Sequence, residues 1–132
     1  MLTASCLCGD IRLRIDAKPG PVTACHCRQC RKITGHHSAA VPVPWALVEV
    51  TGQITWFDSS PAARRGFCGR CGSYLIREGY DGLAYVFTGA IDGATGLRMD
   101  GHIFYADKGD YYRVGEVLRC YATGRSGPEI AP

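Results

Sequence analysis

Apolar and polar residues alternate along much of this chain, with the period of a β-strand. Residues 10–16 are the clearest case, because three aliphatic side chains are interleaved with four charged ones, as in a strand with one buried face. Helix is expected only after Cys27, where RQCRKIT runs up to Gly35 as a C-terminal stop. The pattern predicts a mainly β fold with one or two short helical turns. Further strands are predicted at 38–44, 47–52, 53–58, 73–78, 83–89, 101–107 and 117–123.

The length favours one domain, because 132 residues can enclose a hydrophobic core but are few for two ordinary domains. We expect a single domain over residues 1–124 and a flexible tail at 125–132, where Gly and Pro are frequent. The residues before Cys6 lack the basic region and the apolar run of a signal peptide. No stretch approaches the roughly 18 apolar residues of a membrane helix. We therefore expect a cytoplasmic protein without a membrane partner.

The charge of +3 treats all eight cysteines as neutral thiols. If seven of them bound two zinc ions as thiolates, the charge would fall by seven and rise by four, reaching zero. The basic balance is then no argument for an acidic partner, and no nucleic-acid partner is expected.

Two pairs of cysteines predict a closed metal site. FCGRCGSYL (67–75) has the form of a zinc knuckle, in which a tight turn places two thiolates on one cation. SCLCG (5–9) is the nearest match in kind and also runs into a glycine and a strand. A redox-active Cys-x-x-Cys is the alternative, but it prefers a strand and a helix around it. We predict one four-thiolate zinc site formed by Cys6, Cys8, Cys68 and Cys71.

Three further cysteines, Cys25, Cys27 and Cys30, are close enough in sequence to bind one cation. Zinc held by three protein ligands with an open fourth position is typical of a catalytic site, whereas four ligands make an inert one. We predict that this trio is the catalytic metal site and that water, a histidine or an incoming thiol supplies the fourth ligand. A disulfide framework is the less favoured alternative for the whole set.

A histidine is one candidate for this fourth ligand. His26 stands between two ligands and is expected to point away, while His36 and His37 are nearer the reach of a fourth ligand, although a surface pair is favoured for them. His102 is expected to be a core or edge histidine. Cys120 is expected to be a small buried hydrophobe.

Four motifs in order resemble the glutathione-dependent formaldehyde-activating enzyme family, whose fold is the zinc-bearing β structure called Mss4-like. SCLCGDIRLRI resembles the opening strand of the family, CHCRQCRKITG its Cys-His-Cys-x-x-Cys-x-x-x-x-Gly signature, FCGRCGSYL its knuckle, and FTGAIDGATGLRMDGHIFYADK its closing segment. The chain departs from the family at Tyr74, where proline is usual, and at residues 109–111, where the family has a proline-rich step to Trp. The resemblance implies a structural zinc on Cys6, Cys8, Cys68 and Cys71 and an active-site zinc on Cys25, Cys27 and Cys30.

By that resemblance the chain is expected to be a zinc-dependent carbon-sulfur lyase. Its substrates would be a small-molecule thiol such as glutathione and a small aldehyde such as formaldehyde. Asp92 and His102 are candidates for proton transfer. The alternative is a non-catalytic zinc module that binds a protein or nucleic-acid partner. Candidate partners for the glutathione carboxylates are Arg28, Arg31, Lys32, Arg64, Arg65 and Arg70.

Overall fold

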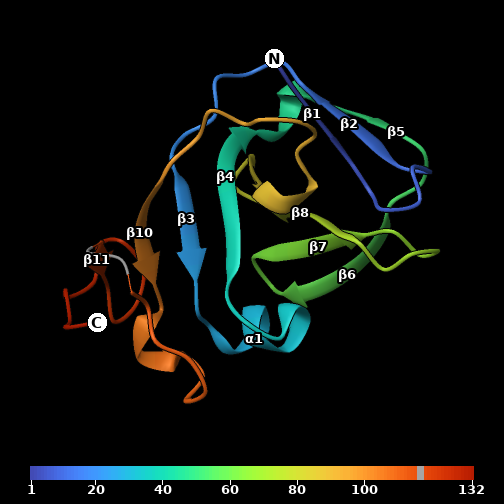
Figure 1. The fold of residues 1–132 in the computed structure, drawn as a ribbon. Helices are drawn as coiled ribbons and strands as arrows, with labels where there is room; N and C mark the ends of the chain where they lie inside the picture. Colours follow the sequence, from blue (N-terminus) through green and yellow to red (C-terminus); the bar gives the residue numbers. More distant parts are fainter. Residues whose placement is uncertain (116–117) are drawn as a thin grey trace. The chain divides into compact units, whose positions relative to one another are not determined.

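The computed structural model describes residues 1–115 and 118–132 and divides the chain into two compact units (Figure 1). Unit one comprises residues 1–20 and 41–96, and unit two comprises residues 21–40 and 97–132. With 42% of residues in strands and 12% in helices, the chain is mainly β, as predicted. The single domain over 1–124 and the flexible tail at 125–132 stay predictions.

Unit one contains a three-stranded antiparallel sheet in the order β1-β2-β5. Its strands are β1 (Leu2–Ser5), β2 (Arg12–Ile15) and β5 (Val48–Thr51). The predicted alternation is confirmed in β2, where Leu13 and Ile15 are buried and the two arginines are exposed. β1 was not predicted from the sequence.

The other strands of unit one form an antiparallel run, β6 (Thr55–Ser60), β7 (Ala63–Phe67), β8 (Tyr74–Gly79) and β9 (Leu83–Phe87) (Figure 1). β7 was not predicted, because its sequence ARRGF has little apolar character. Two isoleucine side chains pack directly over Gly66 in this strand. A Cβ at this position would lie only 2.7 Å from Ile54 Cγ2 and 2.9 Å from Ile76 Cγ2. The turns η1 (Trp45–Leu47) and η2 (Thr88–Ala90) complete the unit.

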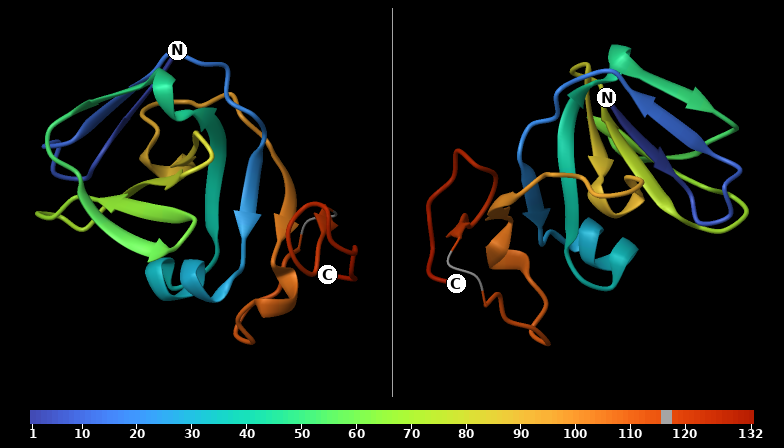
Figure 2. Two further views of the ribbon diagram at one scale, coloured as in Figure 1. Left: turned by 180° about the vertical axis from the view of Figure 1, so that it is seen from behind. Right: turned by 45° about the horizontal axis from the view of Figure 1, so that its top comes forward.

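Unit two is built on β3 (Val22–Cys25), which pairs in parallel with β10 (Met99–Ile103) (Figure 2). β10 also pairs in parallel with β11 (Arg119–Cys120), and α1 (Arg28–Thr34) follows β3 as predicted. The strand predicted at 101–107 ends at Ile103, because Phe104 adopts a left-handed φ of 50° and the turn η3 (Tyr105–Asp107) begins. Of the strand predicted at 117–123, only β11 forms, and Val117 lies outside the described residues.

β4 (Ser38–Pro44) has the bounds that the sequence predicts. In unit two, residues 38–40 pair antiparallel with β3, and in unit one the rest of β4 follows β9 in the strand order. The two prolines lie beyond Ala40, the last residue paired with β3, so β4 forgoes no hydrogen bond to that strand at either proline.

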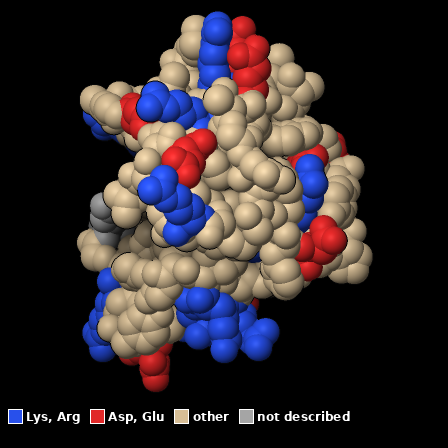
Figure 3. All heavy atoms as spheres, turned by 90° about the vertical axis from the view of Figure 1, so that its right-hand side faces the viewer, with Lys and Arg blue, Asp and Glu red and all other residues tan. Residues whose placement is uncertain are grey.

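Charged side chains of both signs share the face shown in Figure 3, and Lys and Arg gather mainly at its lower end. Over the described residues of this face, basic side chains do not form one continuous surface. No helix among the described residues is long and apolar enough to cross a membrane. The expected absence of a nucleic-acid partner and the expected cytoplasmic location stay predictions.

Candidate metal centres

The first candidate centre, called here the tetrad, consists of Cys6, Cys8, Cys68 and Cys71 in unit one. Its sulfur atoms all lie within 4.8 Å of one another. The Cys6 and Cys8 sulfurs are 3.5 Å apart, and the Cys8 and Cys68 sulfurs are 3.7 Å apart. Zinc-sulfur bonds of about 2.3 Å at tetrahedral angles separate the sulfurs by about 3.8 Å. The donor set of the tetrad therefore fits a four-coordinate zinc ion.

Backbone turns bring these sulfurs together. The knuckle is the turn between β7 and β8, which closes with a 2.8 Å hydrogen bond from the N–H of Gly72 to the carbonyl of Cys68. Gly72 has a φ of 76°, a conformation that favours glycine. A hydrogen bond to the Ser73 hydroxyl, at 3.2 Å, lowers the pKa of Cys71 to about 5. The turn thus supplies groups that stabilise thiolates.

The second candidate centre, called here the trio, consists of Cys25, Cys27 and Cys30 in unit two, with all three sulfurs within 4.8 Å of one another. Cys25 ends β3, Cys27 is the N-cap of α1, and Cys30 lies in the first helical turn. The N–H of Cys30 lies 3.4 Å from the Cys27 sulfur, and the hydroxyl of Ser38 donates to the Cys30 sulfur at 3.2 Å. Among the residues that the structure describes, no fourth donor joins this group.

The three thiols of the trio differ in pKa. Hydrogen bonds from Cys25 and Cys30 lower the pKa of Cys27 to about 2. The pKa of Cys25 is raised, first by its hydrogen bond to Cys27 and then by Cys30 and burial. A hydrogen bond with Cys25 lowers the pKa of Cys30, but Cys27 and burial outweigh it, so that this pKa is raised. The trio therefore holds one thiolate and two thiols at neutral pH.

None of the eight cysteines, all of which lie in the described part of the chain, forms a disulfide. The disulfide alternative is therefore not supported. Cys120 is buried, as predicted.

His26 is fully buried and turns its ring toward other aromatic groups instead of joining the trio. Its Nδ1 lies 2.5 Å from Tyr112 Oη, and its Nε2 lies 2.9 Å from His102 Nδ1. Burial, followed by the nearby charges of His37 and His102, lowers the pKa of His26 to about 3, so this imidazole is neutral at pH 7. His102 is a buried histidine, which confirms the prediction.

His36 and His37 flank this arrangement without belonging to the donor group. The exposed His36 lies edge-on to Tyr112, with ring centroids 4.1 Å apart, and Nδ1 of His37 lies 3.2 Å from the carbonyl oxygen of Ser38. The exposure of His36 agrees with the surface pair that the sequence favours. Ligation of a metal by either histidine stays the less favoured alternative.

Of the predicted carboxylate partners, Arg28, Arg31 and Lys32 lie on α1 beside Cys30. The other three belong to unit one, where each has contacts of its own. Arg64 pairs with Glu78 at 2.5 Å, Arg65 is buried, and Arg70 pairs with Asp10.

Asp92, the other proton-transfer candidate, also belongs to unit one. Its carboxylate accepts a 2.5 Å hydrogen bond from the hydroxyl of Ser5, and its backbone N–H donates to the carbonyl of Thr3. His102 instead contacts His26, the residue between two cysteines of the trio.

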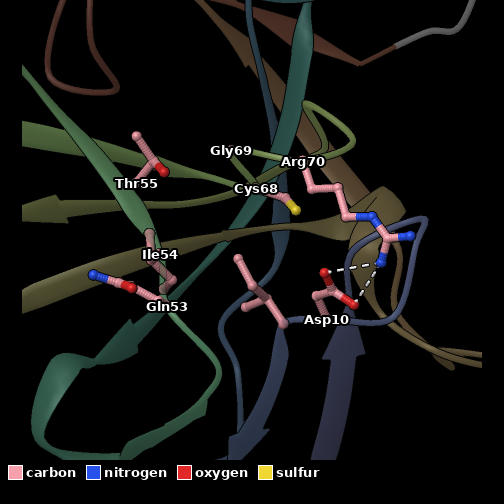
Figure 4. A pocket seen from close by; sticks show the side chains of 8 residues that line it. Asp10, Gln53, Ile54, Thr55, Cys68, Gly69 and Arg70 are labelled. Atoms are coloured by element: carbon pink, nitrogen blue, oxygen red, sulfur yellow. Dashed lines mark hydrogen bonds and ion pairs between the residues drawn. The ribbon is translucent and has the colours of Figure 1, made fainter.

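A pocket of about 410 Å³ adjoins the tetrad (Figure 4). Arg70 and Asp10 lie together in its lining, with one guanidinium nitrogen of Arg70 3.1 Å from each carboxylate oxygen of Asp10. The sulfur of Cys68 and the side chain of Thr55 also line it. A second pocket of about 440 Å³ is lined by Cys6, Ser73 and other residues of unit one. Both lie beside the four-donor centre.

Sequence reasoning did not identify Ser38, Ser73 or Tyr112 as neighbours of the two centres. For Ser73, its position two residues after Cys71 was the available signal. Tyr112 stands 86 residues from His26, and no local pattern connects them.

Comparison with known proteins adds a family and a fold. A family model described as glutathione-dependent formaldehyde-activating enzyme matches residues 1–107. A crystal structure of a Rhodobacter sphaeroides protein, solved as a structural genomics target, is similar with a TM-score of 0.62 at 17% identity. The similarity covers 74% of this chain and 98% of that chain, and at this identity it shows the fold alone. No curated protein matches the chain.

Proposed function

Because the chain belongs to the family of glutathione-dependent formaldehyde-activating enzymes, we propose that it is a zinc-dependent carbon-sulfur lyase. Its substrates would be a thiol of the glutathione class and a small aldehyde. The tetrad would hold a structural zinc, and Cys25, Cys27 and Cys30 would hold the catalytic one.

One observation carries this proposal, namely that the trio offers three sulfur donors within 4.8 Å and no fourth among the described residues. A scaffold has no need of an incomplete donor set, whereas a catalytic centre needs room for a substrate. When bound there, zinc supplies Lewis acidity and keeps a thiol ionised at neutral pH. The tetrad, with four donors, is suited to a structural role instead.

In the synthetic direction, the thiolate sulfur of the substrate attacks the carbonyl carbon of the aldehyde. A sulfur-carbon bond forms, the carbonyl π bond breaks, and the oxygen takes up a proton from water, which balances the proton that the thiol lost on ionising. The lyase direction reverses each change. The part of the chain in this step is to bind and orient the thiol, and Arg28, Arg31 and Lys32 on α1 can pair with carboxylates of a glutathione-like molecule.

The proposal is tested by counting zinc and by following exchange. The wild-type protein is expected to bind two zinc ions per chain and to accelerate exchange between formaldehyde, glutathione and their adduct in two-dimensional exchange NMR. Cys27→Ser is expected to lose one zinc and the acceleration while keeping its fold. Cys120→Ser is the matched control, because it changes a buried cysteine outside both centres.

Two results would contradict the proposal. If the wild-type protein binds two zinc ions but accelerates exchange of no thiol, the lyase reaction is wrong and the non-catalytic zinc module becomes the better account. If it binds only one zinc, the trio is not a metal centre.

A further inference from the structure

Tyr112 belongs to the segment that follows the family match, which ends at residue 107. Its hydroxyl oxygen lies 2.5 Å from Nδ1 of His26. His26 is the residue between Cys25 and Cys27, so it shares a peptide group with each of these cysteines. Whatever fixes His26 therefore also restricts the separation of the two sulfurs.

The backbone N–H and both ring nitrogens of His26 each have a hydrogen-bond partner. Its backbone N–H donates to the carbonyl of Ile103 at 3.0 Å, and its Nε2 lies 2.9 Å from His102 Nδ1. The ring of Tyr105 stands edge-on at a centroid distance of 5.1 Å. Residues of β10 thus partner the backbone N–H and Nε2 of His26, and Tyr112 partners Nδ1.

The hydrogen-bond chain from His102 through His26 to Tyr112 can be satisfied with all three groups neutral. If the Tyr112 hydroxyl donates to Nδ1 of His26, then Nε2–H of His26 donates to Nδ1 of His102. If the chain is reversed, Nδ1–H of His26 donates to the Tyr112 oxygen, and Nδ1–H of His102 donates to Nε2 of His26. Either arrangement uses both ring nitrogens of His26, so neither leaves the ring free to rotate.

Tyr112 is itself fixed by its own segment. Nζ of Lys108 donates to the carbonyl of Tyr112 at 2.7 Å and to that of Gly109 at 2.9 Å. The hydroxyl of Tyr111 donates to the carbonyl of Gly35, just after α1, at 3.0 Å. Residues 108–112 are thus fastened to the end of the helix that carries Cys30.

We infer that Tyr112 is a positioning residue for the trio, which acts through His26 to hold Cys25 and Cys27 in place for a metal ion. The inference rests on the part of the proposed function that makes the trio a metal centre. Groups that orient metal ligands from outside the coordination sphere typically change metal affinity by about 10–100-fold when removed. Tyr112 does so indirectly, because it holds the residue between two ligands.

The test measures metal affinity, independently of activity. The protein is first saturated at the tetrad, and the affinity of the second zinc is measured by competition with a chelator. Co²⁺ absorption reports the geometry of the second centre. Tyr112→Phe removes the hydroxyl and keeps the ring. Tyr80→Phe is the matched control, because it removes a hydroxyl that contacts Asp58 in unit one instead of His26.

We expect Tyr112→Phe to weaken binding of the second metal by at least 10-fold and to alter its Co²⁺ spectrum, with affinity at the tetrad unchanged. Tyr80→Phe is expected to match the wild type. Because Tyr112 acts through His26, adding Tyr112→Phe to His26→Gln should cause no further loss. A general loss of stability would not produce this pattern, since it would affect the tetrad and would be additive.

Three results separate the possibilities. If Tyr112→Phe binds the second metal like the wild type, the inference is overturned and the proposed function stands. If the wild-type protein binds no second metal, the proposed function fails and the inference fails with it. If Tyr112→Phe does not fold, His102→Gln, which removes the contact at Nε2 of His26, must give the same selective loss, and an unchanged second affinity in that variant overturns the inference.

Discussion

Binding of zinc to the trio is expected to release about two protons at pH 7. Two thiolates no more than 4.8 Å apart repel each other by at least about 3.5 kcal/mol at an effective dielectric constant of about 20. This makes ionisation of a second thiol about 350-fold less favourable, and an ordinary thiol is ionised only to a few per cent at pH 7. The metal-free trio therefore carries one thiolate, whereas zinc binds all three sulfurs as thiolates.

The sign of the pH dependence follows from this count. The pKa of Cys27 is lowered to about 2, so this thiol stays ionised throughout the neutral range. The pKa values of Cys25 and Cys30 are raised, so both sulfurs are protonated in the metal-free protein and must lose their protons on binding. Raising the pH favours that loss. The affinity for the second zinc should therefore rise by about 100-fold per pH unit between about pH 6 and 8.

Isothermal titration calorimetry measures the proton release directly. The second zinc is titrated at pH 7 in buffers of different ionisation enthalpy, after the tetrad has been saturated, and the dependence of the heat on the buffer gives the proton count. Cys30→Ser should abolish this second binding event. Release of three protons would show that Cys27 is protonated in the free protein. Release of fewer than one proton would show that the thiolates do not repel each other as strongly as their spacing requires.

Three further predictions concern stability in chemical denaturation. Gly66→Ala should lower the free energy of unfolding by about 1–3 kcal/mol, because the new Cβ would lie 2.7 Å from an Ile54 methyl group. Gly89→Ala, whose Cβ would meet nothing within 4 Å, should lower it far less. Equal losses would contradict the packing argument. Leu75→Ala should cost about 2–5 kcal/mol, because this side chain is fully buried, and a loss well under that range would show that the core can close around the gap. Arg70→Ala should leave the unfolding midpoint nearly unchanged, since its ion pair is exposed, and a clear shift would contradict that view.

The features that the sequence predicts are those with a local signature. β2 follows from the alternation around Leu13, and both cysteine groups follow from their spacing, because thiols brought together by tight turns have few other roles in such a pattern. β7 could not be predicted, because its own sequence has no strand pattern. It forms by pairing with β6 and β8, whose side chains pack closely over Gly66. Tyr112 could not be predicted either, since its contact with His26 depends on chain topology.

The order in which the two units alternate along the chain has a consequence for biosynthesis. His102 and Tyr112 follow His26 by 76 and 86 residues, and at a translation rate of 5–20 residues per second these 86 residues take about 4–17 s. Throughout that time the nascent Cys25, Cys27 and Cys30 thiols lack the partners that arrange them. If the trio binds a metal as proposed, its full affinity is therefore expected only after residue 112 has left the ribosome.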